Sequence, residues 1–182
     1  IEWRQGKKHP FVLSTEASVN LADDEELMRL MVEAGFDAVF VGIETPNEES
    51  LAECAKSQNQ NRDLVGSVKK IQKRGLEVQG GFIVGFDNDP LSIFKSQIDF
   101  IQRSGIVTAM VGLLNAPPGT RLYQRLSQEN RLLACKSFTG NNVDCSINFV
   151  PKMNYETLID GYRQILDTIY SPNHFYERLR TF

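Results

Sequence analysis

The chain has 182 residues, of which 41% are hydrophobic and 24% are charged, a composition typical of a globular domain with one substantial core. Its formal net charge is −3, so it lacks the overall basic field that attracts nucleic acid or anionic membranes, and we expect neither partner. Its apolar runs are shorter than the roughly 20 residues of a membrane-spanning helix, and no signal-like segment opens it, so we expect no membrane span and a cytoplasmic location.

The first elements along the chain are a strand and an amphipathic helix. Residues 11–15 are expected to form the strand. Asp23 and Glu26, three residues apart, match the pattern of a capping box, which predicts a helix that begins at Asp23. The apolar residues spaced to lie on one face of this helix are Leu27, Leu30, Met31 and Ala34.

Three more strands are each preceded by a helix and a glycine. A glycine can adopt the left-handed conformation that ends a helix, and the apolar run after it is typical of a buried strand. The glycines are Gly35, Gly75 and Gly105, and the strands are expected at residues 39–43, 78–84 and 106–114. This alternation predicts an α/β fold of the partial (β/α) TIM-like barrel type, with four parallel strands in chain order and helices on one face.

Two of the crossover helices carry start signals of their own. Asn61 is expected to cap a helix whose apolar positions are Leu64, Val65, Val68 and Ile71. Asp89, which precedes Pro90, is expected to cap the next helix. The buried stripe of that helix is expected to consist of Leu91, Phe94, Ile98 and Ile101.

The sequence pattern changes after Thr120, which is expected to cap a short helix. After this helix, residues 131–149 are expected to lack regular secondary structure. Asn154 is expected to cap a long amphipathic helix. We therefore divide the chain into residues 1–125, the barrel part, and residues 126–182, an irregular segment followed by a C-terminal helical extension.

Ligands of parallel α/β proteins bind at the carboxyl ends of the strands, where this sequence is polar or rich in glycine. Glu44 follows an apolar run and precedes Pro46, so its carboxylate is expected at this rim, where it can accept hydrogen bonds from a ligand. The alternative is that Glu44 caps a short helix at residues 48–55, although Asn47 is better placed for that role.

Two glycine-bearing segments add to the candidate rim. Gly81 lies inside the strand at residues 78–84 and Gly85 ends it, where each costs stability unless a backbone or a ligand approaches closely. Their spacing is not a phosphate-binding fingerprint. Residues 115–119 form a stiff exposed turn after the last strand, which suits a flat ring such as adenine.

The sequence assigns no catalytic residue and no metal ligand. Cys54, Cys135 and Cys145 form no CxxC pair, so neither a disulfide framework nor a zinc site is indicated, and buried free thiols are expected. His9 and His174 lie in the terminal segments and are expected at the surface. No HExxH, GxSxG or paired-carboxylate motif occurs.

Three segments, Phe40 to Thr45, Gly81 to Asp87 and Leu113 to Tyr123, resemble the later strands of the radical S-adenosylmethionine (radical SAM) barrel. They are most similar to the subgroup with a cobalamin-binding domain, which includes hopanoid methylases and the anaerobic magnesium-protoporphyrin monomethyl ester cyclase. The motifs Tyr170-Ser171-Pro172 and Tyr176-Glu177-Arg178 resemble the C-terminal extension of that subgroup, so the resemblance covers nearly the whole chain.

The resemblance implies a set of cofactors and cofactor-binding residues. In such enzymes an early CxxxCxxC loop binds a [4Fe–4S] cluster that reduces SAM; neither this loop nor the glycine–glycine–glutamate element after it occurs in the chain. The full-length protein is then expected to use SAM, a [4Fe–4S] cluster and cobalamin, and the chain alone to be inactive and to hold none tightly. Glu44 would bind the ribose or methionine part of SAM. The residues implied around the adenine and its polar network are Gly81, Ile83, Gly85, Leu114, Asn115 and, more weakly, Glu16.

Three functions are compatible with these sequence features. The first is a fragment of a radical SAM enzyme that methylates or oxidatively cyclises a small-molecule lipid or tetrapyrrole. The second, a complete small α/β domain that binds a phosphorylated metabolite, is disfavoured because a glycine-rich phosphate loop is missing. The third, a non-enzymatic interaction module, does not explain the polar and glycine residues at the strand ends. The first function implies two partners, the missing N-terminal part of the same protein and, at the exposed strand edge of residues 11–15, a second copy.

Overall fold

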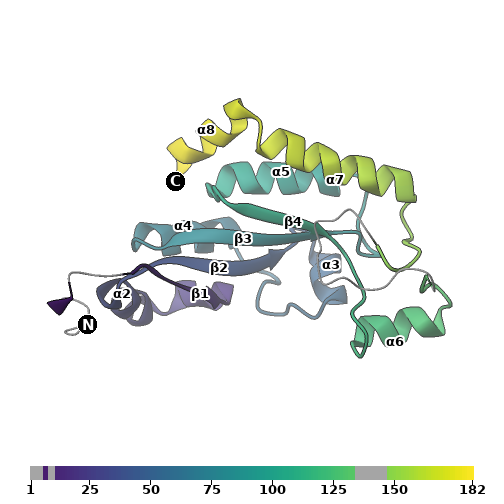
Figure 1. The fold of residues 1–182 in the computed structure, drawn as a ribbon, viewed down its shortest axis with the longest axis horizontal. Coiled ribbons are helices and arrows are strands. Elements are labelled where there is room, and N and C mark those ends of the chain that lie inside the picture. The colour runs from purple at the N-terminus through teal and green to yellow at the C-terminus, as the bar shows by residue number, and fades with distance from the viewer. Residues whose placement is uncertain (1–5, 8–10, 134–146) are drawn as a thin grey trace.

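The computed structural model describes residues 6–7, 11–133 and 147–182, and its centre is a four-stranded parallel sheet (Figure 1). The strands lie in the order β1-β2-β3-β4, and every neighbouring pair is parallel. They are β1 (Leu13–Ala17), β2 (Phe36–Glu44), β3 (Glu77–Val84) and β4 (Ala109–Leu113). The predicted α/β class and strand order are confirmed, with the first strand two residues later than expected.

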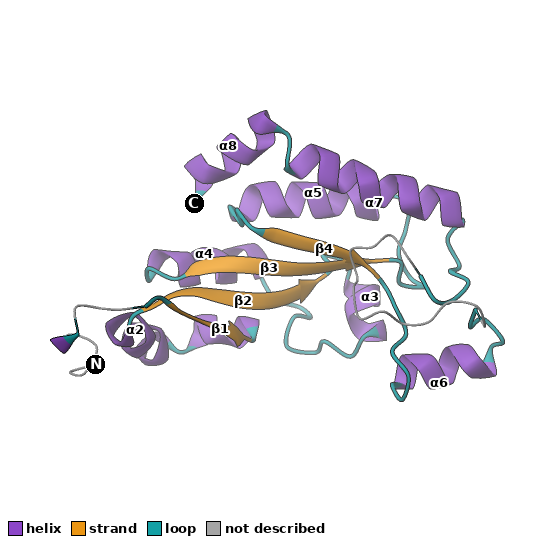
Figure 2. Cartoon of the chain, in the orientation of Figure 1, coloured by secondary structure: helices purple, strands orange, loops and turns teal. Residues whose placement is uncertain are grey.

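Helices connect successive strands, as Figure 2 shows. Between β1 and β2 lie η1 (Val19–Asp23) and α2 (Glu25–Ala34); between β2 and β3 lie α3 (Glu48–Glu53) and α4 (Leu64–Lys73); α5 (Ile93–Ser104) precedes β4. Gly35, Gly75 and Gly105 follow α2, α4 and α5 with φ angles of 89°, 93° and 72°. The prediction that these glycines end helices in the left-handed conformation is confirmed.

The C-terminal residues form a helical layer beside the sheet. It consists of α7 (Tyr155–Ile169) and α8 (Pro172–Thr181), whereas α6 (Arg121–Gln128) lies apart from these two helices in Figure 1. Helix α7 packs against α5 and β4, and α8 packs against α5 (Figure 1). The predicted caps Thr120 and Asn154 are confirmed, because their side-chain oxygens accept the amide N–H of Tyr123 at 3.2 Å and of Thr157 at 3.0 Å.

The two faces of the sheet differ in burial. In β3, Val78 and Val84 are fully buried, whereas Gln79 and Ile83, which point to the other face, are only partly buried. The buried face packs against the crossover helices. The opposite face is called the open face here; by strand register it carries Glu16, Phe40, Gly42, Gly81 and Met110.

The predicted start of α2 is wrong by one residue. Asp24 caps the helix, with its Oδ1 accepting the Leu27 N–H at 2.8 Å, while Asp23 forms an ion pair with Arg62. The apolar face is rotated accordingly, because Met28 is fully buried whereas Leu27 and Leu30 are exposed. Two adjacent aspartates offer equivalent caps in the sequence, and the ion pair selects between them.

The predicted caps of α4 and α5 are also wrong. Asp63, not Asn61, caps α4 by accepting the Gly66 N–H at 2.9 Å. Helix α5 begins at Ile93, so Leu91 is 70% exposed. The carboxylate of Asp89 points toward the residues that precede it and does not cap α5.

The Asp89 carboxylate accepts hydrogen bonds from the N–H groups of Gly85 at 2.8 Å and Phe86 at 3.1 Å, and from the hydroxyl of Ser50 at 2.7 Å. Asp89 therefore stabilises the turn after β3 rather than the helix that follows. In the described part of the chain, no helix is long and apolar enough to cross a membrane.

Candidate functional site

Two glycines form the floor of the candidate site on the open face. Gly42 of β2 and Gly81 of β3 are register partners near the carboxyl ends of their strands. A Cβ atom at Gly42 would lie 2.6 Å from Oε1 of Glu44, and one at Gly81 would lie 2.8 Å from the ring of Phe40. Larger side chains at these two positions would therefore displace the groups that lie over the strands.

Glu44 ends β2 in an unusual backbone conformation. Its φ is 66°, in the left-handed region, and the register between β2 and β3 shifts between Gly42 and Glu44. Such a conformation costs a residue other than glycine about 1–3 kcal/mol and is concentrated at functional sites. The bulge re-aims the Glu44 side chain, which lies over Gly42 and is 18% exposed.

Lys56 is the ion-pair partner of Glu44. Its Nζ lies 2.7 Å from Oε1 of Glu44, and the lysine side chain is 31% exposed. A Cβ at Gly42 would also approach this Nζ to 2.9 Å, so both charges lie above the same glycine. Lys56 was not predictable from the sequence, because it lies in an irregular loop twelve positions after Glu44 and no periodic pattern joins the two residues.

A cavity of about 370 Å³ lies between α3, the turn after β3 and α6. Leu114, one of the predicted site residues, lines it together with Phe86, and Glu53 and Arg121 supply its charged groups. Cys54 also lines the cavity as a partly buried free thiol, and burial raises its pKa. The remaining lining residues are Ala55, Thr120 and Leu122.

The other predicted site residues lie around this region in different settings. Glu16 is exposed in β1, paired in register with Phe40. The Ile83 carbonyl accepts the side-chain N–H of Gln97 at 2.7 Å, and Asn115 donates to the Leu113 carbonyl at 3.3 Å.

Gly85 has a φ of 106° and is buried, and a Cβ there would lie 3.3 Å from Leu158 of α7. The structure thus places Glu44 over Gly42, the register partner of Gly81. Leu114 lies at the cavity, whereas Gly85 lies against the C-terminal helical layer.

Asp87, at the end of the Gly81 to Asp87 motif, anchors an ionic cluster beside the cavity. Its carboxylate is 3% exposed and lies 2.7 Å from Arg125 and 2.6 Å from Arg131. Arg125 also pairs with Glu53 at 2.8 Å, which links α3, the turn after β3 and α6. Burial alone raises the pKa of Asp87, but hydrogen bonds and charge from Arg131 and Arg125 outweigh it and lower the pKa to about 2.

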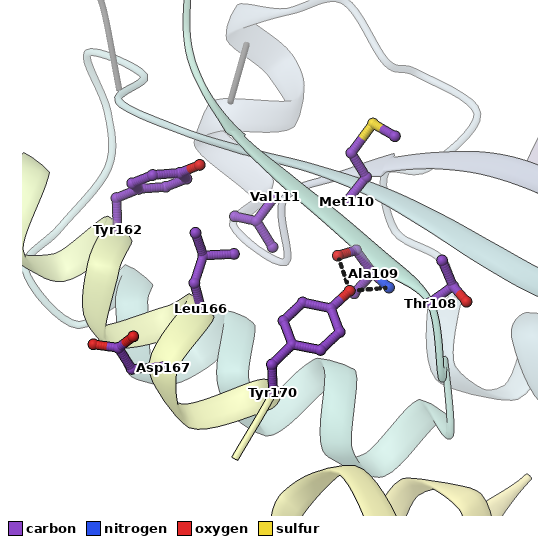
Figure 3. Close-up of a pocket in the computed structure, with 8 residues that line it drawn as sticks. All are labelled: Thr108, Ala109, Met110, Val111, Tyr162, Leu166, Asp167 and Tyr170. Carbon is purple, nitrogen blue, oxygen red and sulfur yellow. Dashed lines mark hydrogen bonds between the residues drawn. The ribbon is translucent and has the colours of Figure 1, made fainter. Parts of the chain in front are cut away.

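A second, open cavity of about 650 Å³ lies between β4 and α7 (Figure 3). Its lining is mostly apolar, with Met110, Val111 and Leu166 on its walls. The hydroxyl of Tyr170 donates to the Ala109 carbonyl at 2.8 Å and accepts the Ala109 N–H at 3.2 Å. Tyr170 therefore attaches the C-terminal helices to the edge of β4, a structural role for the Tyr170-Ser171-Pro172 motif.

Metal ligands do not gather in the described part of the chain. Among residues 6–7, 11–133 and 147–182, no three His, Cys, Asp or Glu side chains are placed to hold a metal ion. Cys135, Cys145 and His9 lie outside the described residues. His174 is partly buried, and its Nδ1 lies 2.8 Å from the hydroxyl of Ser171.

Comparison with known proteins shows that the chain is homologous to methyltransferases. It is 43% identical to an uncharacterized methyltransferase of Synechocystis sp. over 97% of the chain and 33% of that protein. It is 30% identical to the hopanoid C-2 methylase of Rhodopseudomonas palustris over 98% of the chain and 32% of that protein. It is 25% identical to the bacteriochlorophyllide d C-12(1)-methyltransferase of Chlorobaculum tepidum over 90% of the chain and 35% of that protein.

These matches place the chain within longer relatives. The chain spans about a third of the length of each of these three proteins. Residues 120–182 match the family described as a domain of unknown function, DUF4070. This match covers α6 and the two helices of the C-terminal helical layer, α7 and α8.

Proposed function

We propose that the chain is the C-terminal part of a radical SAM methylase that acts on a polycyclic lipid or a tetrapyrrole. Similarity to methyltransferases over nearly the whole chain supports the enzyme class. Methylation is favoured over oxidative cyclisation, because the relatives are named for methyl transfer, two of them to a hopanoid and to a bacteriochlorophyllide. The proposal also takes residues 1–125 as part of a partial barrel and residues 126–182 as its helical extension.

One observation carries the assignment of the SAM site: the Glu44–Lys56 ion pair lies over Gly42, the register partner of Gly81, at the carboxyl ends of parallel strands. SAM has an amino group, a carboxylate, ribose hydroxyls and a flat adenine, and when bound it supplies the methyl group and the radical chemistry. In the proposed site Glu44 accepts hydrogen bonds from ribose hydroxyls or the amino group, and Lys56 pairs with the carboxylate.

The remaining predicted residues complete this proposed site. Gly81 forms the floor with Gly42, and Ile83 and Gly85 follow it on the same strand and the turn after it. The apolar cavity at Leu114 takes the adenine, with the Asn115 backbone next to it, and Glu16 extends the polar network from β1.

The cluster and cobalamin are proposed to be held by residues outside those described. A [4Fe–4S] cluster needs about three closely spaced thiolates besides SAM, and the described residues do not fit this requirement, because they contain no group of three ligands. No chemical step is therefore assigned to this chain's residues through either group. We propose that an upstream part of the same protein supplies the cluster and pairs with the outer edge of β1.

The test of the SAM site is a binding measurement on the full-length protein under anaerobic conditions. Glu44→Gln removes the negative charge but keeps the shape, and we expect it to weaken SAM binding about tenfold, a loss of about 1.4 kcal/mol. Glu49→Gln on the exposed face of α3 is the matched control and should bind as the wild type does. Equal SAM affinity in the wild type and Glu44→Gln would contradict the proposed site.

A further inference from the structure

The end of β2 needs hydrogen-bond donors from outside the sheet. The register shift between Gly42 and Glu44 interrupts the ladder with β3, so backbone carbonyls at this point lie out of the regular pattern. The amide of Thr45 donates to the Ile43 carbonyl at 2.9 Å, which tightens the chain just after Glu44. The left-handed conformation of Glu44 persists only if its surroundings fix it.

Asn59 supplies side-chain donors to two carbonyls at this point. Its side chain is 1% exposed, and its Nδ2 donates to the Gly42 carbonyl at 3.1 Å and to the Ile43 carbonyl at 3.0 Å. These are the two residues directly before Glu44. Because both partners are carbonyl oxygens, the NH₂ group of the Asn59 amide must point toward them and donate to both. A carboxylate at this position would be repelled by the same two oxygens.

The same residue also fixes the loop that bears Lys56. The backbone N–H of Asn59 donates to the Lys56 carbonyl at 2.9 Å, and the N–H of Lys56 donates to the Leu51 carbonyl at 3.0 Å at the end of α3. Asn59 is therefore bonded through its side chain to the strand of Glu44 and through its backbone to Lys56 itself. Among the described residues, Oδ1 of Asn59 is buried and has no hydrogen-bond partner. The hydrogen bonds of the Asn59 side chain are therefore those that its NH₂ group donates.

We infer that Asn59 is a positioning residue that holds the Glu44 and Lys56 side chains next to each other as one ligand-binding pair. This inference rests on the proposed function, in which the pair binds SAM. Asn59 does not touch the ligand in this arrangement. It lowers the cost of binding because the two charges need not be brought together when SAM arrives.

The experiment measures SAM affinity in the full-length protein by anaerobic calorimetry. Asn59→Leu keeps the size of the side chain but removes both donors, and we expect SAM binding to weaken about tenfold. Asn61→Gly, an exposed position in the same loop with a φ of 52°, is the control and should leave the affinity unchanged. Asn59→Ala is the second variant, because it leaves space for a water molecule to reach the two carbonyls if Asn59→Leu fails to fold.

A double-mutant cycle distinguishes positioning from a general structural role. If Asn59 acts through the pair, adding Asn59→Leu, or Asn59→Ala where that is used, to the double variant Glu44→Gln/Lys56→Met should change the affinity less than about twofold, although the same change costs about tenfold in the wild type. Equal losses in both backgrounds, unchanged affinity in the variant used, or failure of both Asn59 variants to fold would overturn the positioning role. If instead Glu44→Gln itself binds SAM as tightly as the wild type, the SAM site is refuted, and the role of Asn59 with it.

Discussion

Glu44 ends β2 and Asp87 follows β3, and the surroundings of these two acidic residues give them different roles. Glu44 lies on the open face with one partly exposed lysine, an arrangement in which a ligand can compete for either charge. Asp87 is paired with two arginines and its side chain is 3% exposed, so its carboxylate is occupied by contacts within the protein. Glu44 is therefore the carboxylate proposed for ligand binding, and Asp87 is the one that holds the cavity walls together.

Removing the charge of Asp87 should destabilise the fold. Asp87→Asn removes the buried carboxylate that Arg125 and Arg131 share, and we expect the free energy of unfolding to fall by about 1–3 kcal/mol. Asp99→Asn breaks the exposed pair with Lys95 on α5 and should cost less than about 0.5 kcal/mol. Urea denaturation at neutral pH measures both, and equal losses in the two variants would contradict the role assigned to Asp87.

The depressed pKa of Asp87 also predicts a pH dependence. Between its ordinary pKa of 3.8 and about 2, the unfolded chain binds more protons at this group than the folded chain does. Its contribution to stability is therefore complete above about pH 4 and is lost as the pH falls toward 2. Wild type should lose more stability than Asp87→Asn in urea titrations from pH 4 to pH 2, and parallel curves for the two proteins would count against the shift.

Single residues were predictable from the sequence where their role is local. The place of Glu44 followed from the apolar run before it, and Thr120 and Asn154 followed from the helices that begin after them. Lys56 and Asn59 were not predictable, because their partners are reached through an irregular loop. Their pairing depends on tertiary structure that no sequence period encodes.

At the scale of whole elements, α8 is attached by a fully buried arginine. Arg178 donates to the Gln102 side chain at 2.7 Å and to the Ile169 carbonyl, and its guanidinium lies 5.7 Å from the ring centroids of both Tyr170 and Phe175. Burial lowers its pKa. These contacts join α5, α7 and α8, which explains why an arginine ends the Tyr176-Glu177-Arg178 motif.

Arg178→Ala should therefore release α8. We expect a loss of about 2–4 kcal/mol in unfolding free energy, because the variant removes both the stacking and the hydrogen bonds of a buried side chain. Arg180→Ala, on the exposed side of the same helix, should change stability by less than about 0.5 kcal/mol. Limited proteolysis should cut the Arg178→Ala variant faster within residues 170–182, and equal cleavage rates in the two variants would contradict the anchoring role.

The existence and order of the elements were more predictable than their ends. Hydrophobic period and glycine position located the strands and the crossover helices, because both signals extend over many residues. Helix starts failed where several cap residues stood close together, as at Asp23 with Asp24 and at Asn61 with Asp63. The choice between neighbouring caps was decided by tertiary contacts such as the ion pair between Asp23 and Arg62.

At the scale of the whole molecule, the two outer strands of the sheet differ. The edge of β4 is covered in part by Tyr170 of the C-terminal helical layer. Strand β1 has β2 as its only sheet neighbour within the described residues, and Phe11 and Val12 beside it are 52% and 69% exposed. An unpaired edge next to exposed apolar side chains favours strand addition.

The isolated chain should therefore self-associate through β1. Light scattering over a range of concentrations should show a mass that rises above that of the monomer. Thr15→Pro removes a backbone donor from β1 and should reduce the association if the edge mediates it. A strictly monomeric chain at high concentration would contradict the prediction.

The most direct test of the central claim is SAM cleavage by the full-length protein after anaerobic reconstitution with iron and sulfide. The cleavage product is measured for the wild type, for Glu44→Gln and for a variant in which Cys54, Cys135 and Cys145 are all replaced by alanine. We predict that the wild type and the cysteine variant cleave SAM, that Glu44→Gln does so much more slowly at limiting SAM, and that the isolated chain forms no cluster and cleaves none. A wild type that fails to cleave SAM, or a cluster that depends on these three cysteines, would contradict the account.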